Sequence, residues 1–362
     1  MSLTELRDSL SAVDHKIVEL IAERQRIVAE IGRQKRGAGT ATRDYAREKD
    51  VLDMGREQAE ALGVDPDLAE AVLRQLIRTS LESQERDRVI AEGKGDGRSV
   101  LVIGGGGKMG GWFVEFFASQ GFAPTIADAS LDDEPPRVYR NWTDAGVDYD
   151  VIVVAAPLAV SGRILAQLAV LKPRGLVFDI GSLKSPLMDG LNELRDAGCQ
   201  VTSIHPMYGP DTRLLSGRHL IVCDVGCAEA TAAAKELFAA TMVEQLDMGL
   251  EDHDRLIAYV LGLSHALNIA FFTALAESGE AAPKLARLSS TTFDSQLEVS
   301  EAVAQDNPHL YYEIQHLNKF GLAPLDALSE AATRIRELVA TGDEGGFVEL
   351  MEKGRDYFAM RG

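Results

Sequence analysis

The stretch Ser99-Val-Leu-Val-Ile-Gly-Gly-Gly-Gly-Lys-Met-Gly110 decides the fold. It joins a short apolar run (99–103) to a helical segment that we expect from Gly111 to about Gln120. Its glycines include the spacing G-x-G-x-x-G, in which the first lets the chain turn, the second lets the backbone approach a pyrophosphate and the third lets helix pack on strand. The helix N-terminus then faces the phosphates. The stretch predicts a dinucleotide site, with cofactor contacts at Gly105, Gly107, Lys108, Met109 and Gly110.

Two further strand ends extend this predicted site. An apolar run at 123–127 ends at Asp128, and an acid there suits two ribose hydroxyls and repels a 2′-phosphate, so NAD is favoured over NADP. Ala156 and Pro157 follow the run at 151–155, and open α/β sheets bind ligands at the carboxyl ends of strands. We therefore place both among the cofactor residues. The alternative reading is a glycine-rich turn in a fold that binds no nucleotide.

The pattern around this stretch divides the chain into parts. Short apolar runs at 99–103, 123–127, 151–155, 176–180 and 219–223 alternate with helical segments, which indicates a doubly wound parallel sheet, a Rossmann-type α/β domain, over 99–250. Residues 1–90 and 251–362 show helical patterning only, and the glycine- and charge-rich segment 91–98 is typical of a linker. We expect a multidomain protein, with an all-α domain of three helices, the sheet domain, and an all-helical C-terminal domain.

The first 90 residues predict three long helices. Apolar residues recur at three- and four-residue steps from Leu6 to Ile31, Ser2 with Glu5 forms a capping box, and 37–40 ends this helix. A second helix is expected over 43–61, and a third from Asp65-Pro66 to about Arg88. Three helices of this length cannot bury their apolar faces alone, so dimerisation through the long first helix is expected.

Composition excludes several classes of function. The net charge of −19 argues against nucleic acid as a partner and against a polybasic membrane surface. The three cysteines, Cys199, Cys223 and Cys227, indicate a reducing cytoplasm, and no second pair of ligands accompanies them, so we predict no metal. The polar N-terminus lacks the pattern of a signal peptide. The apolar segment 256–272 contains His265 and Asn268 and is interpreted as a buried helix, with no membrane partner expected.

A second cluster of reactive side chains also follows strand ends. The run at 176–180 leads into Asp179-Ile-Gly-Ser-Leu-Lys184, and further on stands His205-Pro-Met-Tyr-Gly-Pro-Asp211. A lone histidine is more often structural than catalytic. A histidine at a strand end, in a loop shaped by glycine and proline beside a hydroxyl and an acid, is a better candidate for a general base. We therefore expect His205 to be catalytic.

These motifs carry a resemblance to a known family. Residues 99–362 resemble the prephenate dehydrogenase family, and the whole chain resembles the bifunctional chorismate mutase–prephenate dehydrogenases of tyrosine biosynthesis. The matching stretches are Val102 to Gly110, Asp179 to Lys184, His205 to Asp211, Glu251 to His265 with its pair His253-Asp254, Gln305-Asp306 and Leu310-Tyr311. The resemblance implies NAD-dependent oxidative decarboxylation of prephenate to 4-hydroxyphenylpyruvate.

The same resemblance assigns roles in the dehydrogenase site. It implies that His205 accepts the proton of the substrate's C4 hydroxyl, and that Ser182 hydrogen-bonds the histidine and that hydroxyl. It places Asp211 at the substrate pocket and His265 on the helix that closes it. These expectations agree with the position of His205 after a strand.

One position departs from the family pattern. The family has an arginine for a substrate carboxylate where this chain has Glu301, and a glutamate beside Asp211 would repel prephenate. Arg213 or Arg218 then supplies the missing cation, or the substrate carries an ammonium group, as arogenate and 4-amino-4-deoxyprephenate do, or Glu301 points away. The sequence leaves these readings open.

The N-terminal helices resemble the all-helical chorismate mutase. The matching positions are Arg7, Arg24, Lys35, Asp44, Arg47, Glu48, Ser80 and Gln84. A Claisen rearrangement needs no nucleophile, only binding of the folded dicarboxylate and stabilisation of negative charge on the breaking ether oxygen. Arginines bind the carboxylates of such a substrate. The resemblance implies that Lys35 and Gln84 flank the ether oxygen and that Glu48 holds the ring hydroxyl.

Helix geometry adds a prediction about assembly. Arg24 and Lys35 are 11 residues apart, about 16 Å along a helix and nearly on one face, so both reach one ligand. Arg7 is roughly 25 Å from Arg24 and off that face, so it reaches the ligand only from a partner's antiparallel helix. This predicts a homodimer with shared sites. An alternative interpretation of the charged N-terminal residues is that they are solvated charges on a surface helix. Alternative interpretations of the whole chain are a non-catalytic NAD-binding module, or an unrelated dehydrogenase with a helical dimerisation module.

Overall fold

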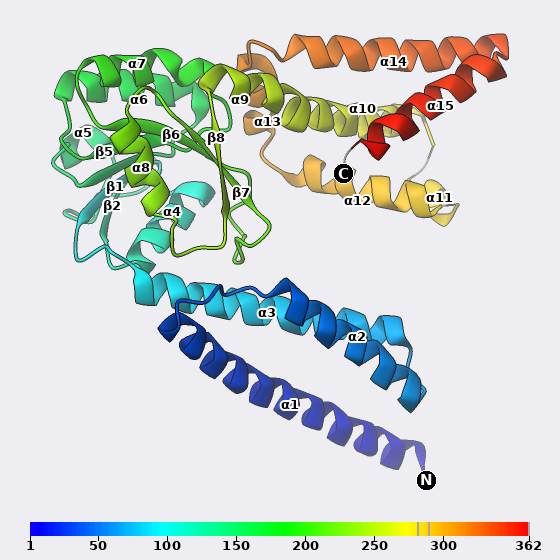
Figure 1. The fold of residues 1–362 in the computed structure, drawn as a ribbon. Coiled ribbons are helices and arrows are strands. Elements are labelled where there is room, and N and C mark those ends of the chain that lie inside the picture. The colour runs from blue at the N-terminus through cyan, green and yellow to red at the C-terminus, as the bar shows by residue number, and fades with distance from the viewer. Residues whose placement is uncertain (281, 289, 361–362) are drawn as a thin grey trace.

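The N-terminal helices form an extended layer beside a sheet domain. The computed structural model describes residues 1–280, 282–288 and 290–360. Helices α1 (Leu3–Gly37), α2 (Tyr45–Leu62) and α3 (Pro66–Glu92) lie beneath the sheet domain in Figure 1, coloured blue to cyan. The predicted capping box of Ser2 and Glu5 is present, and Asp65 caps α3 with Pro66 at its start. The expected ends were right to within a few residues.

The long helix α1 leaves its apolar residues exposed. Leu10 is 61% exposed and Leu20 is 64% exposed, although the periodicity of α1 is that of a buried stripe. Its C-terminal half packs against α3 at Gly32, where an added Cβ would lie 3.1 Å from Cγ of Gln84. Within one chain, therefore, most of the apolar stripe of α1 has no cover.

The central domain is an open sheet with helices on both faces. In the described residues its eight strands have the order β3-β2-β1-β4-β5-β6-β7-β8. The strands are β1 (Ser99–Ile103), β2 (Ala123–Ala127), β3 (Val138–Tyr139), β4 (Val151–Val154), β5 (Leu176–Asp179), β6 (Val201–Pro206), β7 (His219–Cys223) and β8 (Glu244–Met248). The doubly wound fold is as predicted, but β6 and β7 pair antiparallel, so the sheet is mixed. Strands β3, β6 and β8 were not among the predicted runs.

Alternate residues of each strand build two cores. Leu101 and Ile103 face one core with α6 (Leu158–Leu171) and α7 (Met188–Asp196). Val100 and Val102 face the other, with α4 (Lys108–Ser119) and α8 (Ala228–Glu236). The short helices α5 (Trp142–Ala145) and η1 (Ser185–Leu187) complete the domain. Because both faces are covered, the central strands β1 and β4 are almost wholly apolar.

The C-terminal helices extend from the opposite side of the sheet domain to α1 (Figure 1). They are α9 (Leu250–Ile257), a π-helical turn η2 (Ala258–Leu263), α10 (Ser264–Glu277), α11 (Ala282–Arg287), α12 (Thr291–Gln305), α13 (Pro308–Leu317), α14 (Leu322–Thr341) and α15 (Glu344–Ala359). The continuous helical stretch Leu250–Glu277 is long and apolar enough to cross a membrane by length and composition. Within the single chain, 22% of its most apolar 18-residue window is buried.

Candidate active sites

The glycine-rich loop after β1 forms a tight cradle. Gly104 has a φ of +90°, and a Cβ there would lie 2.6 Å from the carbonyl of Ala155, so the turn depends on Gly104 and not on Gly105 as expected. A Cβ on Gly110 would lie 2.1 Å from the oxygen of Gly104, which is the close helix–strand packing expected of the third glycine. Helix α4 begins at Lys108, earlier than predicted, with Gly107 at its N-cap and no side chain on its first N–H groups. These N–H groups suit a pyrophosphate.

Asp128 stands at the carboxyl end of β2, facing this cradle. Its Oδ2 accepts the N–H of Gly106 (3.0 Å), and its Oδ1 accepts the N–H (2.9 Å) and hydroxyl (2.6 Å) of Ser130. Burial alone would raise the pKa of the carboxyl, but the hydrogen bonds from Ser130, Gly106 and Gly107 together lower it. An ionised acid held here fits the ribose hydroxyls of NAD. Met109 and Ala156 are half-buried beside the cradle, and Lys108 and Pro157 are exposed.

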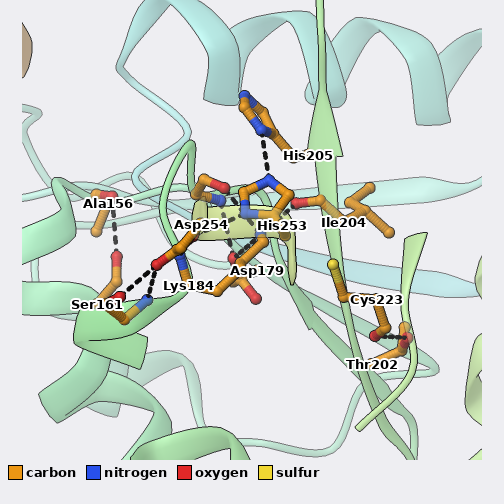
Figure 2. A network of polar contacts seen from close by, with 12 residues as sticks. Ala156, Ser161, Asp179, Lys184, Thr202, Ile204, His205, Cys223, His253 and Asp254 are labelled. Carbon is orange, nitrogen blue, oxygen red and sulfur yellow. Dashed lines mark hydrogen bonds and ion pairs between the residues drawn. The ribbon is translucent and has the colours of Figure 1, made fainter. Parts of the chain in front are cut away.

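A buried lysine joins the ends of two central strands. Lys184 is fully buried, and its Nζ donates to Oδ1 of Asp179 (2.9 Å) and to the carbonyls of Gly181 and Ile204 (both 2.8 Å). Asp179 ends β5, and Ile204 precedes His205 on β6, so Lys184 fixes the backbone beside the histidine (Figure 2). No role for Lys184 was predicted from the sequence. The sequence feature that could have indicated its role is a lysine five residues after an aspartate at a strand end.

His205 is the first member of a hydrogen-bonded relay. Its Nδ1 lies 2.9 Å from Nε2 of His253, whose Nδ1 lies 2.7 Å from Oδ1 of Asp254 (Figure 2). An ionised carboxylate only accepts, so the Nδ1–H of His253 donates to Asp254, and the Nε2 of His253 is left to accept from the Nδ1–H of His205. The Nε2 of His205 therefore carries a lone pair. This is the tautomer that a general base requires.

The relay is anchored by the segment after β5. Asp254 accepts the backbone N–H of Lys184 (2.7 Å) and both the N–H and the hydroxyl of Ser185. Burial would raise the pKa of the Asp254 carboxyl, but the bonds from His253, Ser185 and Lys184 lower it. Asp254 thus stays ionised and sets the tautomers of both histidines. From the sequence, His253 and Asp254 were predicted only as a pair that matches the family, because the contact between α9 and β6 is long-range.

Several hydroxyl and imidazole atoms in the stretches that match the family are buried and have no partner among the described residues. They are the hydroxyl oxygens of Ser182 and Tyr208 and the Nδ1 of His265. Ser182 therefore makes no hydrogen bond to His205, contrary to the expectation from the resemblance. An unpaired buried polar atom costs about 1–3 kcal/mol, so atoms of this kind suit a polar ligand. His265 stacks on Tyr311, with ring centroids 4.1 Å apart.

The remaining predicted substrate residues are exposed. Asp211 and Arg213 lie in the loop after β6, and Arg218 lies at its end, all with exposed side chains. Glu301 is exposed on α12, where it accepts a hydrogen bond from Gln305 (3.0 Å). Glu301 and Asp211 thus belong to different domains, and the single chain gives no support for the predicted pair of acids.

A second polar cluster lies between α1 and α3. Nη1 of Arg24 donates to Oγ of Ser80 (2.6 Å) and to the carbonyl of Leu76 (3.0 Å). Gln84 is buried one turn further on, and its Oε1 has no partner among the described residues. Burial lowers the pKa of the Arg24 guanidinium, so an anion beside it would relieve an unfavourable desolvation. The structure brings Arg24, Ser80 and Gln84 together as predicted.

The other predicted residues of this cluster sit at the α1–α2 connection. Lys35 donates to the carbonyl of Thr42 (2.8 Å), and Asp44 caps α2 by accepting the N–H of Arg47 (3.0 Å). Glu48 pairs with Arg43 through two hydrogen bonds of 2.9 Å, and Arg43 was not among the residues predicted from the sequence. Arg7 is exposed near the start of α1, more than four turns from Arg24. The single chain therefore leaves Arg7 outside the cluster.

These two sites define the class of protein. The mixed Rossmann-type sheet, the glycine cradle, Asp128 and the buried histidine relay are typical of a nicotinamide-dependent dehydrogenase. The helical N-terminus carries a separate cationic site that suits a carboxylate ligand. In the described residues, no group of three or more His, Cys, Asp or Glu side chains is arranged to hold a metal ion.

Comparisons with known proteins assign both halves. The model of chorismate mutase type II matches residues 6–85, that of the prephenate dehydrogenase nucleotide-binding domain matches 137–244, and that of the prephenate dehydrogenase dimerization domain matches 250–353. The chain belongs to the family of bifunctional chorismate mutase–prephenate dehydrogenases, and its cofactor is NAD.

Individual relatives agree with this assignment. The T-protein of Enterobacter agglomerans is 28% identical over 98% of this chain and 93% of its own length. A 4-amino-4-deoxyprephenate dehydrogenase of Streptomyces pristinaespiralis is also 28% identical, but over 74% of this chain and 93% of its own length. The structure of Aquifex aeolicus prephenate dehydrogenase, with hydroxyphenyl propionate and NAD+, superposes with a TM-score of 0.58 at 18% identity and covers 73% of this chain and 98% of its own. This last likeness supports the fold.

Proposed function

We propose that the chain performs two consecutive reactions, rearranging chorismate to prephenate and then oxidatively decarboxylating prephenate to 4-hydroxyphenylpyruvate. The observation that carries the second reaction is the relay from Asp254 through His253, which leaves the Nε2 of His205 unprotonated. The first reaction is supported by the cluster of Arg24, Ser80 and Gln84, which combines a half-buried cation with a buried amide whose Oε1 has no partner among the described residues. Both halves carry the family matches already described.

In the dehydrogenase half, His205 acts as the base. The N–H groups at the start of α4 hold the pyrophosphate, and Asp128 holds the ribose. When bound, NAD+ supplies the hydride acceptor for the oxidation. The Nε2 of His205 takes the proton of the substrate's C4 hydroxyl, and Ser182, whose own hydroxyl has no partner among the described residues, hydrogen-bonds the same oxygen. Loss of CO₂ then aromatises the ring and makes the reaction irreversible.

In the mutase half, the protein binds and orients without forming a covalent bond. Arg24, and Arg47 from α2, bind the substrate carboxylates, and Lys35 and Gln84 stabilise the charge that develops on the ether oxygen. Glu48 accepts a hydrogen bond from the ring hydroxyl of the substrate. To do so, it must give up hydrogen bonds that it makes with Arg43 in this structure. Holding the reactive conformer accounts for much of the rate enhancement of such a reaction.

We further propose a homodimer in which the mutase sites are shared. The exposed apolar stripe of α1 and the exposed residues of α9 to α10, such as Tyr259 (51%) and Val260 (53%), supply two surfaces that a second copy covers. An antiparallel partner of α1 brings its own Arg7 to Arg24. A cytoplasmic location is supported by the three free cysteines.

Steady-state assays test the proposed function directly. Chorismate alone should disappear at a saturable rate, and addition of NAD+ should then produce NADH. Prephenate, arogenate and 4-amino-4-deoxyprephenate are supplied separately to compare kcat/KM. Formation of no NADH with any of the three would refute the dehydrogenase assignment, and unchanged chorismate would refute the mutase assignment.

The first prediction concerns pH. Burial, with the nearby His253 and Lys184, holds the pKa of His205 well below the 6.5 of a free histidine. The neutral base therefore predominates above pH 6.5, and activity should be lost only as the pH falls through the lowered pKa, by about tenfold per pH unit. We expect kcat/KM for prephenate to stay level from pH 8 to about 6.5. Mutase activity measured over the same range controls for unfolding, and a decline already centred on pH 7 would contradict the lowered pKa.

The second prediction concerns Glu301. Because Glu301 is exposed and bonded within its own helix, Glu301→Arg should change the ratio of kcat/KM for prephenate to that for arogenate by no more than about twofold. The ratio is measured with both substrates on one enzyme preparation, with Glu298→Arg on the same helix as a control. A shift of about tenfold or more toward prephenate would show that Glu301 meets the substrate in the assembled enzyme.

A further inference from the structure

The mutase helix α3 holds a loop of the dehydrogenase. The loop from Met207 to Arg218, here called the substrate loop, follows His205 and carries Asp211 and Arg213. Within its own domain, the substrate loop is tied by Trp112, whose Nε1 donates to the carbonyl of Thr212 (3.1 Å). Its far end is tied instead to the N-terminal helices.

Glu85 on α3 makes the contact with the far end of the substrate loop. Its side chain is 3% exposed, and its Oε2 accepts the backbone N–H of Leu215 (2.7 Å) while its Oε1 accepts the backbone N–H of Met242. Leu215 belongs to the substrate loop, and Met242 lies just before β8. One carboxylate thus joins two segments of the dehydrogenase domain that flank β7. A buried carboxylate kept in place by two N–H donors is a strong, oriented contact.

The charge of Glu85 also acts on the substrate loop. Tyr208, in the His-Pro-Met-Tyr-Gly-Pro-Asp run, has its pKa raised first by burial and then by the negative charge of Glu85. Burial likewise raises the pKa of Glu85 itself, and the N–H groups of Leu215 and Met242 counter this only in part. The contact that carries the argument is the hydrogen bond from Leu215 to Glu85, and the effect on Tyr208 is electrostatic only.

A second contact links the same loop to the mutase site. Arg43 donates to Glu48 on one side and to Oγ of Ser216 on the other (2.8 Å). On α3, Ser80 and Gln84 face the mutase cluster, and Glu85, one residue and about 100° further round, faces the dehydrogenase. The mutase site and the substrate loop thus share adjoining residues of one helix.

We propose that Glu85 is a positioning residue for the dehydrogenase reaction, holding the substrate loop so that prephenate binds beside His205. This inference rests on the proposed function, because it assigns the loop to prephenate. A carboxylate is required because both of its oxygens accept. In glutamine one of them becomes an NH₂ group, which would face a backbone N–H and break one tie.

The experiment compares Glu85→Gln with wild type in the full chain. We expect the KM for prephenate to rise by about tenfold, because one tie of the loop is lost and an N–H is left unpaired. The KM for NAD+ and the mutase kcat/KM should stay within about twofold of wild type. Glu92→Gln is the matched control, since Glu92 is an exposed carboxylate on α3 that pairs with Arg88, and it should change neither activity. An unchanged KM for prephenate, or a parallel loss of both activities, would overturn the proposal.

Two further measurements keep the test decisive. Ser216→Ala, which removes only the second contact, should raise the KM for prephenate by about twofold without affecting the fold. Hydrogen exchange should be faster in Glu85→Gln in peptides that contain Leu215 and Met242, and unchanged in β1 and β4. Hydrogen exchange is measured independently of activity. If the wild-type protein were inactive on prephenate, the proposed function would be refuted. If Glu85→Gln left the protection of these peptides unaltered, the positioning role of Glu85 would be refuted.

Discussion

Replacing His205 with asparagine should lower kcat for prephenate oxidation by about a thousandfold and leave the chorismate mutase rate within about twofold of wild type. Asparagine keeps a polar group near His253, so the buried pocket retains a partner for the relay. It supplies no nitrogen lone pair of comparable basicity, so the C4 hydroxyl has no acceptor for its proton. The mutase cluster lies on α1 and α3, separate from β6, and should not respond.

The measurement is NADH formation under saturating prephenate and NAD+, with chorismate consumption followed on the same sample. His219→Asn is the matched control, because His219 is an exposed histidine on β7 that pairs with Glu244. It should retain full activity in both assays. If His205→Asn kept more than about a tenth of the wild-type kcat, the base would have to be another group. If it lost mutase activity as well, the two sites would not be separate.

The motif around His205 was predictable, but the relay behind it was not. The segment from His205 to Asp211 could be recognised from its sequence and from its resemblance to the family. A strand end was expected at His205, but the run of β6 was not delimited, because Thr202, Ser203 and His205 interrupt its apolar pattern, although all three are buried. The tautomer of His205 depends on His253 and Asp254, 48 residues away from it at the nearest contact. A pairing of that range arises from packing of α9 on the sheet, which no local spacing encodes.

The burial of Lys184 could not be predicted from the sequence either. A lysine is almost never fully buried unless it is paired, so composition predicts an exposed side chain there. Asp179 and two backbone carbonyls supply the partners, and they come together only when β5 and β6 pair. The amphipathic pattern of α1 was likewise readable, and the helix is as long as expected. What covers its apolar stripe is not encoded in the periodicity, because the pattern is the same for an intramolecular and an intermolecular contact.

Arg24→Ala should lower kcat/KM of the mutase by about a thousandfold and leave prephenate oxidation within about twofold. Arg24 is the half-buried cation of the cluster, fixed by Ser80 and the carbonyl of Leu76, and alanine removes both its charge and that fixed geometry. Arg26→Ala is the matched control, since Arg26 lies on the same helix with an exposed side chain. Chorismate consumption measures the loss, and retention of more than about a tenth of the activity would contradict a role in binding the substrate carboxylate.

The same variant tests whether the mutase site is shared. If Arg7 enters from a partner's α1, then Arg7→Ala and Arg24→Ala remove residues of one site from opposite protomers. After the two inactive variants are mixed and their subunits exchanged, each heterodimer contains one site with both arginines and one with neither. Half of the dimers are then mixed, and the mutase activity should recover to roughly a quarter of wild type. No recovery, with exchange verified by mass, would show that Arg7 and Arg24 act within one chain. Arg7 would then need a route to the ligand that the straight helix from Leu3 to Gly37 does not provide.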